Sequence, residues 1–188
     1  MEYLKTDLEG VIVCVPKVYN DKRGYFVETY VASELNLVLG YDVEFIQDNE
    51  AKSTFGVVRG LHFQKGSSSQ AKLLRVIKGE VLDVVVDLRK DSKTFGKSYA
   101  RRLNDITKEM LFVPRGFAHG YAVLSDEAIV AYKVDNLYDP ESESGLLYND
   151  PELNIDWGLG VEERVLSEKD IQNPKFKEVY KFEKDFYV

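Results

Sequence analysis

The chain of 188 residues has a single cysteine, only two histidines and no long apolar run. One cysteine excludes an internal disulfide and is consistent with a reducing compartment, so we expect a cytoplasmic protein. No segment approaches the ~20 consecutive apolar residues of a membrane-spanning helix, and we expect no membrane association. The first ten residues carry acidic side chains and lack the apolar core of a signal peptide.

An excess of basic charge is also missing, because the formal net charge is -7 at pH 7. Nucleic-acid-binding proteins normally present a basic field, so we expect no nucleic-acid partner. A small anionic ligand held by a few local cations remains compatible with this balance. Neither histidine belongs to a His-X-His pair, and this spacing argues against a metal site, so we expect no bound metal.

Aromatic residues are present at 12%, and short apolar segments alternate with turns. Aromatic side chains suit half-buried β-structure. We predict strands at 11–15, 44–47, 72–77, 81–88, 110–113, 121–124 and 129–134, with hairpin turns at 78–80 and 125–127. Many short strands with frequent turns are typical of an all-β sandwich or barrel.

Other segments indicate the connections and helices. Residues 19–26 are polar and predict a turn or loop, whereas 33–39 predict a helix with Ser33 at its start and Gly40 ending it in the left-handed conformation. Within 81–88, one strand face carries Asp83 and Asp87 together with Val81 and Val85, and the other carries Leu82, Val84, Val86 and Leu88, which predicts a strand with one buried face. From Asp139 onward we predict an ordered but irregular segment with a short helix at 167–171. No linker is visible, so we expect one domain over residues 1–188.

Both histidines lie near arginine and glycine, His62 in RGLHFQ and His119 in PRGFAHGY. Histidine is suited to proton transfer near neutral pH, although a structural histidine with one hydrogen bond is an equal alternative. Taken one at a time, Lys72 is typical of a strand end, Tyr132 of a core aromatic and Asp170 of a helix cap or surface charge. The residues alone therefore indicate a β-barrel with a cationic, histidine-containing pocket.

The run from Arg23 to Asp170 resembles the dTDP-4-dehydrorhamnose 3,5-epimerase family. The matching segments occur in the family's order and are RGYFVETY, FIQDNE, GVVRGLHFQ, QAKLLRVIKGEVLDVVVDLR, TFGK, LFVPRGFAHGYAVLS, YKVDNLYDPESESG, NDPELNIDW and LSEKD. The resemblance implies a cupin-like jelly-roll barrel with a few short helices and no cofactor. It also implies a homodimer in which the partner subunit completes the pocket.

The resemblance further implies roles for individual residues. His62 matches the catalytic base, and Asp170 matches the aspartate that orients it. Tyr132 matches the proposed acid, and Lys72 a lysine beside the substrate ketone. Further positions match residues that line the nucleotide-sugar site, namely Arg23, Phe26, Glu28, Gln47, Asn49, Arg59, His119, Tyr138 (stacked on the thymine ring), Glu143 and Lys169. Two departures, the KGSSSQ loop and Phe63 after the histidine, lie near the pocket.

The implied reaction inverts C3 and C5 of dTDP-4-dehydro-6-deoxy-D-glucose to give dTDP-4-dehydro-L-rhamnose. A mono-epimerase, or an epimerase of another 4-keto nucleotide sugar, would share the same catalytic groups. A metal-dependent cupin is disfavoured by the missing His-X-His pair. A non-catalytic sugar-binding cupin is disfavoured because binding alone needs no base and acid.

Overall fold

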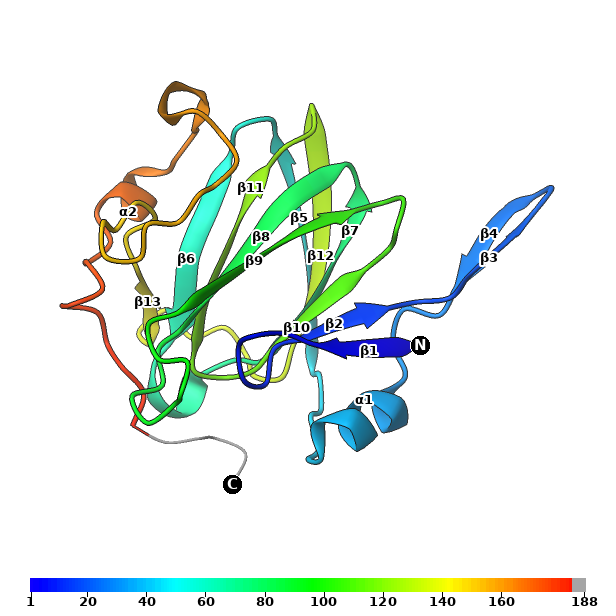
Figure 1. Cartoon of the computed structure of the whole chain (residues 1–188), viewed down its shortest axis with the longest axis horizontal. Helices are drawn as coiled ribbons and strands as arrows, with labels where there is room; N and C mark the ends of the chain where they lie inside the picture. Colours follow the sequence, from blue (N-terminus) through cyan, green and yellow to red (C-terminus); the bar gives the residue numbers. More distant parts are fainter. Residues whose placement is uncertain (184–188) are drawn as a thin grey trace.

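Two antiparallel sheets face each other and enclose the core (Figure 1) in the structure, a computed structural model that describes residues 1–183. The six-stranded sheet has the order β1 (Glu2–Lys5), β2 (Ile12–Val15), β10 (Met110–Val113), β7 (Lys72–Lys78), β12 (Glu127–Val134) and β5 (Gln47–Thr54). The five-stranded sheet has the order β13 (Glu143–Gly145), β6 (Val58–Gln64), β11 (Phe117–Val123), β8 (Glu80–Asp87) and β9 (Ser98–Asn104). The predicted all-β class is confirmed.

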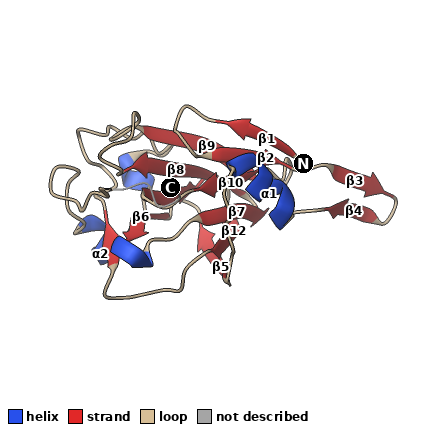
Figure 2. Ribbon diagram, turned by 90° about the horizontal axis from the view of Figure 1, so that it is seen from below, coloured by secondary structure: helices blue, strands red, loops and turns tan. Residues whose placement is uncertain are grey.

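A separate hairpin of β3 (Val18–Asp21) and β4 (Gly24–Val27) extends from one end of the barrel. The prediction of a loop at 19–26 is therefore wrong. The chain reverses over Lys22 and Arg23, where the Arg23 backbone N–H and guanidinium donate to the Asp21 carboxylate at 2.8 and 3.0 Å. The hairpin and α2 (Glu168–Ile171) lie at opposite ends of the molecule (Figure 1, Figure 2).

The two predicted hairpin turns are real turns that join strands of different sheets. β7 pairs with β10 and β12, whereas β8 pairs with β11 and β9. The turn at 125–127 likewise leads from β11 in one sheet to β12 in the other. The two turns pack on each other, because the Glu80 backbone N–H donates to Ser125 Oγ at 2.8 Å. Turn residues specify a reversal of the chain but not the strand beside which it continues, so the predicted hairpin pairing is wrong.

The predicted strand and helix boundaries agree with the structure in some places and differ in others. The strands at 11–15, 110–113 and 129–134 are found, but the strand expected at 44–47 begins only at Gln47. Besides the β3–β4 hairpin, four further strands were not predicted, namely β1, β6, β9 and β13. α1 (Ala32–Leu39) ends at Gly40 in the left-handed conformation as predicted (φ 79°), but its N-cap is Val31 rather than Ser33. α2 begins after Ser167 as predicted, and two short 3₁₀ turns cover Gly66–Ser68 and Val161–Glu163.

The core has a layer on each side of the five-stranded sheet. One layer fills the barrel interior and includes Leu74, Val81 and Val85. The other lies beneath the C-terminal segment, whose Trp157 packs in the same cluster as Val84 and Val86 of β8. β8 is consequently buried on both faces, and the prediction of one buried face is wrong because the irregular C-terminal segment covers the second. Among residues 1–183, no helix is long and apolar enough to cross a membrane.

Candidate active site

A cavity of about 170 Å³ opens into the barrel interior between the two sheets. It is lined by Ala51, Arg59, His62, Lys72, His119, Gly120, Tyr121, Val130 and Tyr132. A hollow of about 270 Å³ has His62, Lys72 and Tyr132 in common with it and is also lined by Gln47, Asn49, Phe63, Gln64, Gln70, Tyr138 and Glu143. The inner cavity and the hollow, which we call the mouth, thus form one continuous site.

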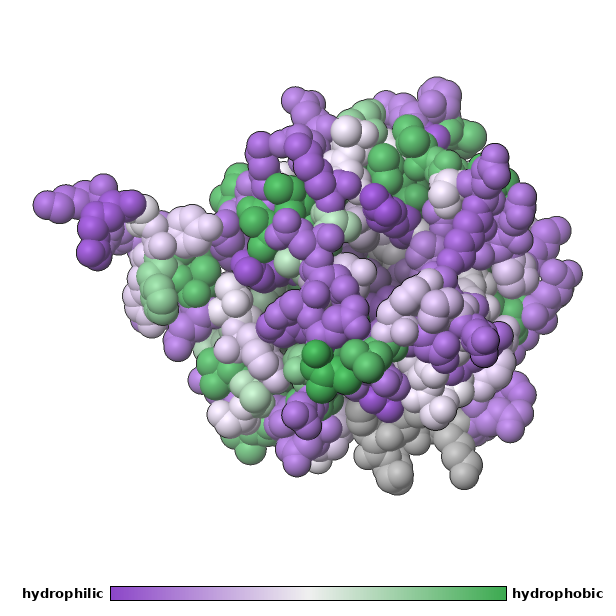
Figure 3. Space-filling model, turned by 180° about the vertical axis from the view of Figure 1, so that it is seen from behind, coloured by the Kyte–Doolittle hydropathy of each residue, from purple (hydrophilic) through white to green (hydrophobic). Residues whose placement is uncertain are grey.

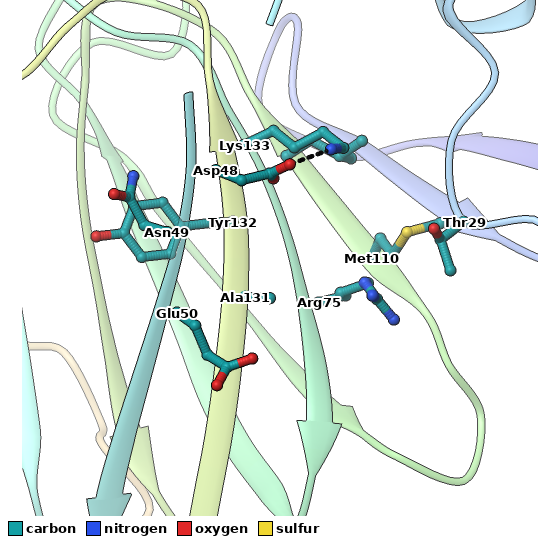
Figure 4. A pocket seen from close by; sticks show the side chains of 10 residues that line it. Thr29, Asp48, Asn49, Glu50, Arg75, Met110, Ala131, Tyr132 and Lys133 are labelled. Carbon is teal, nitrogen blue, oxygen red and sulfur yellow. Dashed lines mark hydrogen bonds and ion pairs between the residues drawn. The ribbon is translucent and has the colours of Figure 1, made fainter. Parts of the chain in front are cut away.

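Strand periodicity explains why these polar side chains point inward. Along β12, Val130 and Tyr132 occupy alternate positions on the barrel-facing side, and along β7 Lys72 has the same parity as the buried Leu74. Figure 4 shows Tyr132 and Asn49 on one side of the six-stranded sheet and Arg75 on the other. A lysine and a tyrosine that look ordinary in sequence therefore project into the same cavity.

The two histidines are cross-strand neighbours, since His119 on β11 pairs in register with His62 on β6. Two glycines make this close approach possible. A Cβ atom on Gly60 would lie 2.6 Å from Gly120 Cα, and one on Gly120 would lie 2.6 Å from the Arg59 carbonyl oxygen. Backbone packing therefore requires glycine at both positions, and the strand pairing places both imidazoles at one wall of the cavity.

His62 forms a dyad with Asp170. Its Nε2 lies 2.5 Å from Asp170 Oδ1, and Ser167 Oγ donates to the other carboxylate oxygen at 2.7 Å. Burial alone would raise the pKa of Asp170, but the hydrogen bonds from His62 and Ser167 outweigh it and hold the pKa below its usual value. An ionised carboxylate only accepts hydrogen bonds, so Nε2 carries the proton and Nδ1 is the basic nitrogen of His62.

A second dyad joins His119 to Asp83, with Nε2 and Oδ2 separated by 2.9 Å. Asp83 is 0% exposed and lies on the barrel-facing side of β8. Asp83 is not among the predicted site residues. The signal available in the sequence is that Asp83 shares a strand face with Val81 and Val85. Because both faces of β8 are buried, this face lies in the barrel interior.

Lys72 and Tyr132 complete the inner cavity. Burial lowers the pKa of Lys72 to about 8, against the opposing effect of the negative charges of Asp83 and Glu143. Burial raises the pKa of the Tyr132 phenol, an effect partly offset by the positive charge of Arg59. At neutral pH the cavity thus presents one ammonium and one protonated phenol beside the His62 imidazole.

Comparison with known proteins identifies the family that shares this arrangement. Residues 5–178 match the family model described as dTDP-4-dehydrorhamnose 3,5-epimerase. The chain belongs to that family. A relative of this name from Methanothermobacter thermautotrophicus is 50% identical over 169 residues, covering 89% of this chain and 90% of the relative.

Solved structures of family members superpose on nearly the whole chain. The epimerase from Elizabethkingia anophelis has a TM-score of 0.92 at 47% identity, covering 95% of this chain and 97% of its own. The dTDP-6-deoxy-D-glucose-3,5-epimerase from Legionella pneumophila, solved with dTDP-4-keto-L-rhamnose, has a TM-score of 0.93 at 40% identity and 98% coverage of both chains. The cupin-like jelly roll implied by the resemblance is therefore confirmed.

In this member of the epimerase family, a hydrogen-bonded group lines the mouth. Glu143 Oε2 accepts from the Tyr138 hydroxyl at 2.8 Å and pairs with Lys169 Nζ at 2.5 Å. Burial would raise the pKa of Glu143, but these two partners lower it overall. The predicted residues Tyr138, Glu143 and Lys169 are thus brought together beside His62.

Gln64 fixes the backbone on both sides of Tyr138, although sequence reasoning did not select it. Its Nε2 donates to the Leu137 carbonyl oxygen at 3.0 Å, and its Oε1 accepts from the Asp139 backbone N–H at 2.8 Å. The unusual KGSSSQ loop adds a further bond, from Ser68 Oγ to Asp139 Oδ2 at 2.8 Å. The loop therefore helps to fix the backbone next to Tyr138.

Three predicted residues are not brought to this site. Arg23 and Phe26 lie on the projecting hairpin and Glu28 directly follows it, at the end of the molecule opposite α2. The other predicted residues line the cavity and its mouth or are bonded to residues that do, namely Gln47, Asn49, Arg59, His62, Lys72, His119, Tyr132, Tyr138, Glu143, Lys169 and Asp170. Among residues 1–183, no cluster of three or more His, Cys, Asp or Glu side chains could hold a metal ion.

Proposed function

We propose that this chain inverts C3 and C5 of dTDP-4-dehydro-6-deoxy-D-glucose to give dTDP-4-dehydro-L-rhamnose, acting in the cytoplasm as a single-domain enzyme. The observation that carries the proposal is one cavity holding an oriented base, a cation and a phenol, supplied by His62, Lys72 and Tyr132. Family membership supports the same reaction. The chemistry uses side chains of this chain and requires no cofactor.

Proton abstraction is the first task. The hydrogens on C3 and C5 are both alpha to the C4 ketone, so a base beside the ring can remove either one. His62 Nδ1 is that base, and Asp170 fixes its tautomer and stabilises the imidazolium that forms. A positioned base or acid typically contributes ~10²–10⁴-fold in rate.

Charge then develops on the ketone oxygen as an enolate. The Lys72 ammonium lines the cavity with His62 and donates a hydrogen bond to this oxygen. Such preorganised electrostatic stabilisation is often the largest single contribution to catalysis. Since the pKa of Lys72 is about 8, the cation is present at neutral pH and is lost as the pH rises through that value.

Inversion requires a proton to return on the opposite face of the ring. His62 comes from β6 of one sheet and Tyr132 from β12 of the other, so a sugar between them meets the base on one face and the phenol on the other. Burial keeps the Tyr132 phenol protonated by raising its pKa. We assign Tyr132 as the acid, and solvent at the mouth restores its proton.

The nucleotide end of the substrate lies toward the mouth. Tyr138 is 56% exposed there and offers a flat face for the thymine ring. Arg59 lines the inner cavity, where it is held through Ser53 Oγ at 2.9 Å and presents a guanidinium that suits a phosphate group of the substrate. Gln47 and Asn49 hydrogen-bond each other at 2.8 Å and supply amide groups at the same mouth.

The active form we propose is a homodimer in which the hairpin of one subunit completes the site of the other. Arg23 is strongly exposed, Phe26 is 64% exposed, and the hairpin stands clear of the body with a hydrophilic tip (Figure 3). A groove of about 310 Å³ on the outer face of the six-stranded sheet includes Arg75, which has no ion-pair partner within residues 1–183 (Figure 4). A second copy covers this face and delivers its hairpin.

Subunit complementation tests the shared site. His62→Ala inactivates the barrel of its own chain, whereas Arg23→Ala combined with Phe26→Ala inactivates only the hairpin. When the two inactive variants are mixed and allowed to exchange, about a quarter of all sites regain an intact barrel and an intact hairpin, because half of the random dimers are mixed and each has one good site. Sites built within one chain would stay inactive in the mixture.

Proton NMR in heavy water tests the reaction itself. With dTDP-4-dehydro-6-deoxy-D-glucose, we expect deuterium at both C3 and C5 and conversion to the L-rhamno product. Deuterium at one carbon alone would indicate a mono-epimerase. Absence of exchange at both carbons would overturn the proposed function in favour of a different nucleotide sugar or a binding protein.

A further inference from the structure

Asp83 is a buried carboxylate that the mechanism above does not use. It is 0% exposed, and within residues 1–183 its Oδ1 has no hydrogen-bond partner. Its Oδ2 lies 2.9 Å from His119 Nε2. A buried charge with a half-satisfied hydrogen-bonding capacity is costly unless a nearby opposite charge compensates it.

The groups around Asp83 identify that opposite charge. Arg101 lies directly across from it on β9, but its guanidinium donates to Glu109 at 2.9 and 2.7 Å. His119 is bonded through Nε2 and turns its other edge toward the cavity. The charge of Asp83 acts on the Lys72 ammonium and opposes the effect of burial on it. Lys72 is therefore the cation for which Asp83 is the interior counter-charge.

The other titratable or charged groups around Lys72 come from several strands. They are His62 and Arg59 on β6, His119 and Tyr121 on β11, Tyr132 on β12 and Glu143 on β13. Of the carboxylates, Glu143 is at the mouth and is already paired with Lys169. Asp83 is thus the fully buried anion of this group, and the His119 side chain that it holds at 2.9 Å lines the same cavity as Lys72.

We propose that Asp83 is a positioning residue for epimerisation, which keeps Lys72 an ammonium at working pH and fixes the His119 ring with Nδ1 toward the substrate. This inference rests on the proposed function of the same cavity. Without the Asp83 charge, burial would strip the proton from Lys72 at lower pH and weaken enolate stabilisation. With it, a lysine surrounded by protein remains a cation beside the ketone oxygen.

The test is Asp83→Asn, which keeps the shape of the side chain and removes its charge. We expect the rate of deuterium exchange at neutral pH to fall toward a limit on the order of 10²-fold, which is the effect of losing one oxyanion donor completely. The wild-type rate falls as pH rises through about 8, where Lys72 loses its proton. In the variant, this alkaline decline moves to lower pH, because the neutral amide no longer stabilises the ammonium.

Asp87→Asn is the matched control. Asp87 is equally buried on the same strand, but its carboxylate is bonded to Arg89, Ser92 and Thr94 outside the cavity. We expect this variant to lose thermal stability and to keep the wild-type alkaline decline. An Asp83→Asn enzyme that is slower with an unmoved decline would show a merely structural role and overturn the inference.

A readout without substrate separates this inference from the proposed function. Titration of the Lys72 side chain by NMR, assigned with Lys72→Arg, gives its pKa directly in wild type and in Asp83→Asn. We expect a lower value in the variant, and equal values would overturn the inference even if the wild type exchanges deuterium normally. If Asp83→Asn does not fold, Asp83→Ser removes the same charge with a smaller side chain. Failure of the wild type to exchange deuterium would count against the proposed function alone.

Discussion

The two His–Asp dyads use the same chemical groups in different surroundings. In the first, the His62 side chain is 31% exposed and its Asp170 partner is carried by α2, outside the barrel. In the second, the His119 side chain is 9% exposed and Asp83 lies on the adjacent strand of the same sheet. The histidines themselves are opposite each other in register.

This contrast shows how surroundings assign different roles to identical pairs. A dyad open to the cavity on one side can bind a proton and release it, so His62 and Asp170 suit acid–base chemistry. An enclosed dyad has little room to change its charge without cost, so His119 and Asp83 suit a fixed electrostatic and hydrogen-bonding role. The same kind of substitution made in each dyad should therefore change the activity to very different extents.

The largest expected effect is that of His62→Ala. It removes the base, and we expect deuterium exchange at C3 and C5 to fall by at least ~10³-fold. Calorimetric titration with dTDP should give nearly wild-type affinity, because the nucleotide contacts are elsewhere in the mouth. A variant that still epimerised at a normal rate would show that the base has been assigned wrongly.

The next largest effect is expected from Asp170→Asn. The amide preserves the shape of the side chain but no longer stabilises the imidazolium or enforces the Nε2 tautomer, so we expect a loss of ~10²–10⁴-fold in kcat. KM should change little, since Asp170 lies behind His62 and is not among the residues that line the cavity. Burst and steady-state assays with the dTDP sugar measure both constants. A large rise in KM with unchanged kcat would contradict the orienting role.

Much of the open dyad could be anticipated from the sequence, whereas the closed one could not. His62 and Asp170 are 108 positions apart, and no periodicity relates them. Only the family resemblance joined them, because α2 reaches β6 through an irregular segment that local patterns do not describe. The short helix itself was predictable, since Ser167 is a good N-cap and accepts a hydrogen bond from the Asp170 backbone N–H.

Asp83 was missed for a physical reason that concerns the whole fold. Alternation along β8 separated its two faces correctly but did not indicate that both would be buried. That fact depends on Trp157 and its neighbours covering the outer face, which is a long-range contact. The same limit explains the wrong hairpin pairing, since a turn signal at Gly79 is local whereas sheet membership is set by partners distant in sequence.

His119→Gln is expected to have a smaller effect. The Gln side-chain amide lies close to the position of the imidazole Nε2 and can still donate to Asp83, so the buried carboxylate keeps a partner, while the imidazole edge facing the substrate is lost. We expect an approximately tenfold loss in kcat/KM, in the range of one hydrogen bond to a charged group, carried mainly by KM. Steady-state kinetics would separate the constants. A loss in kcat as large as that of His62→Ala would mean that His119 also transfers a proton.

The smallest expected effect concerns the hydroxyl that holds Asp170. Ser167 Oγ donates to Asp170 Oδ2 at 2.7 Å and caps α2 through the Asp170 backbone N–H at 3.2 Å. Ser167→Ala should lower the free energy of unfolding by about 1 kcal/mol, as for loss of an N-cap, and reduce kcat a few-fold. The matched control is Ser92→Ala, which removes a similar 2.6 Å bond to the buried Asp87 far from the cavity.

The pH dependence of that stability loss identifies its origin. The folded pKa of Asp170 is below its unfolded value, so its ionised form stabilises the fold above the unfolded pKa, and this contribution disappears as pH falls through the folded pKa. Ser167→Ala raises the pKa of Asp170 in the folded protein. The difference in free energy of unfolding between the variant and wild type should therefore become smaller in acid. Only the part due to the lost backbone cap should remain there. A difference that is constant with pH would mean that Ser167 supports only the helix, and the open dyad would then rely on His62 alone to keep Asp170 ionised.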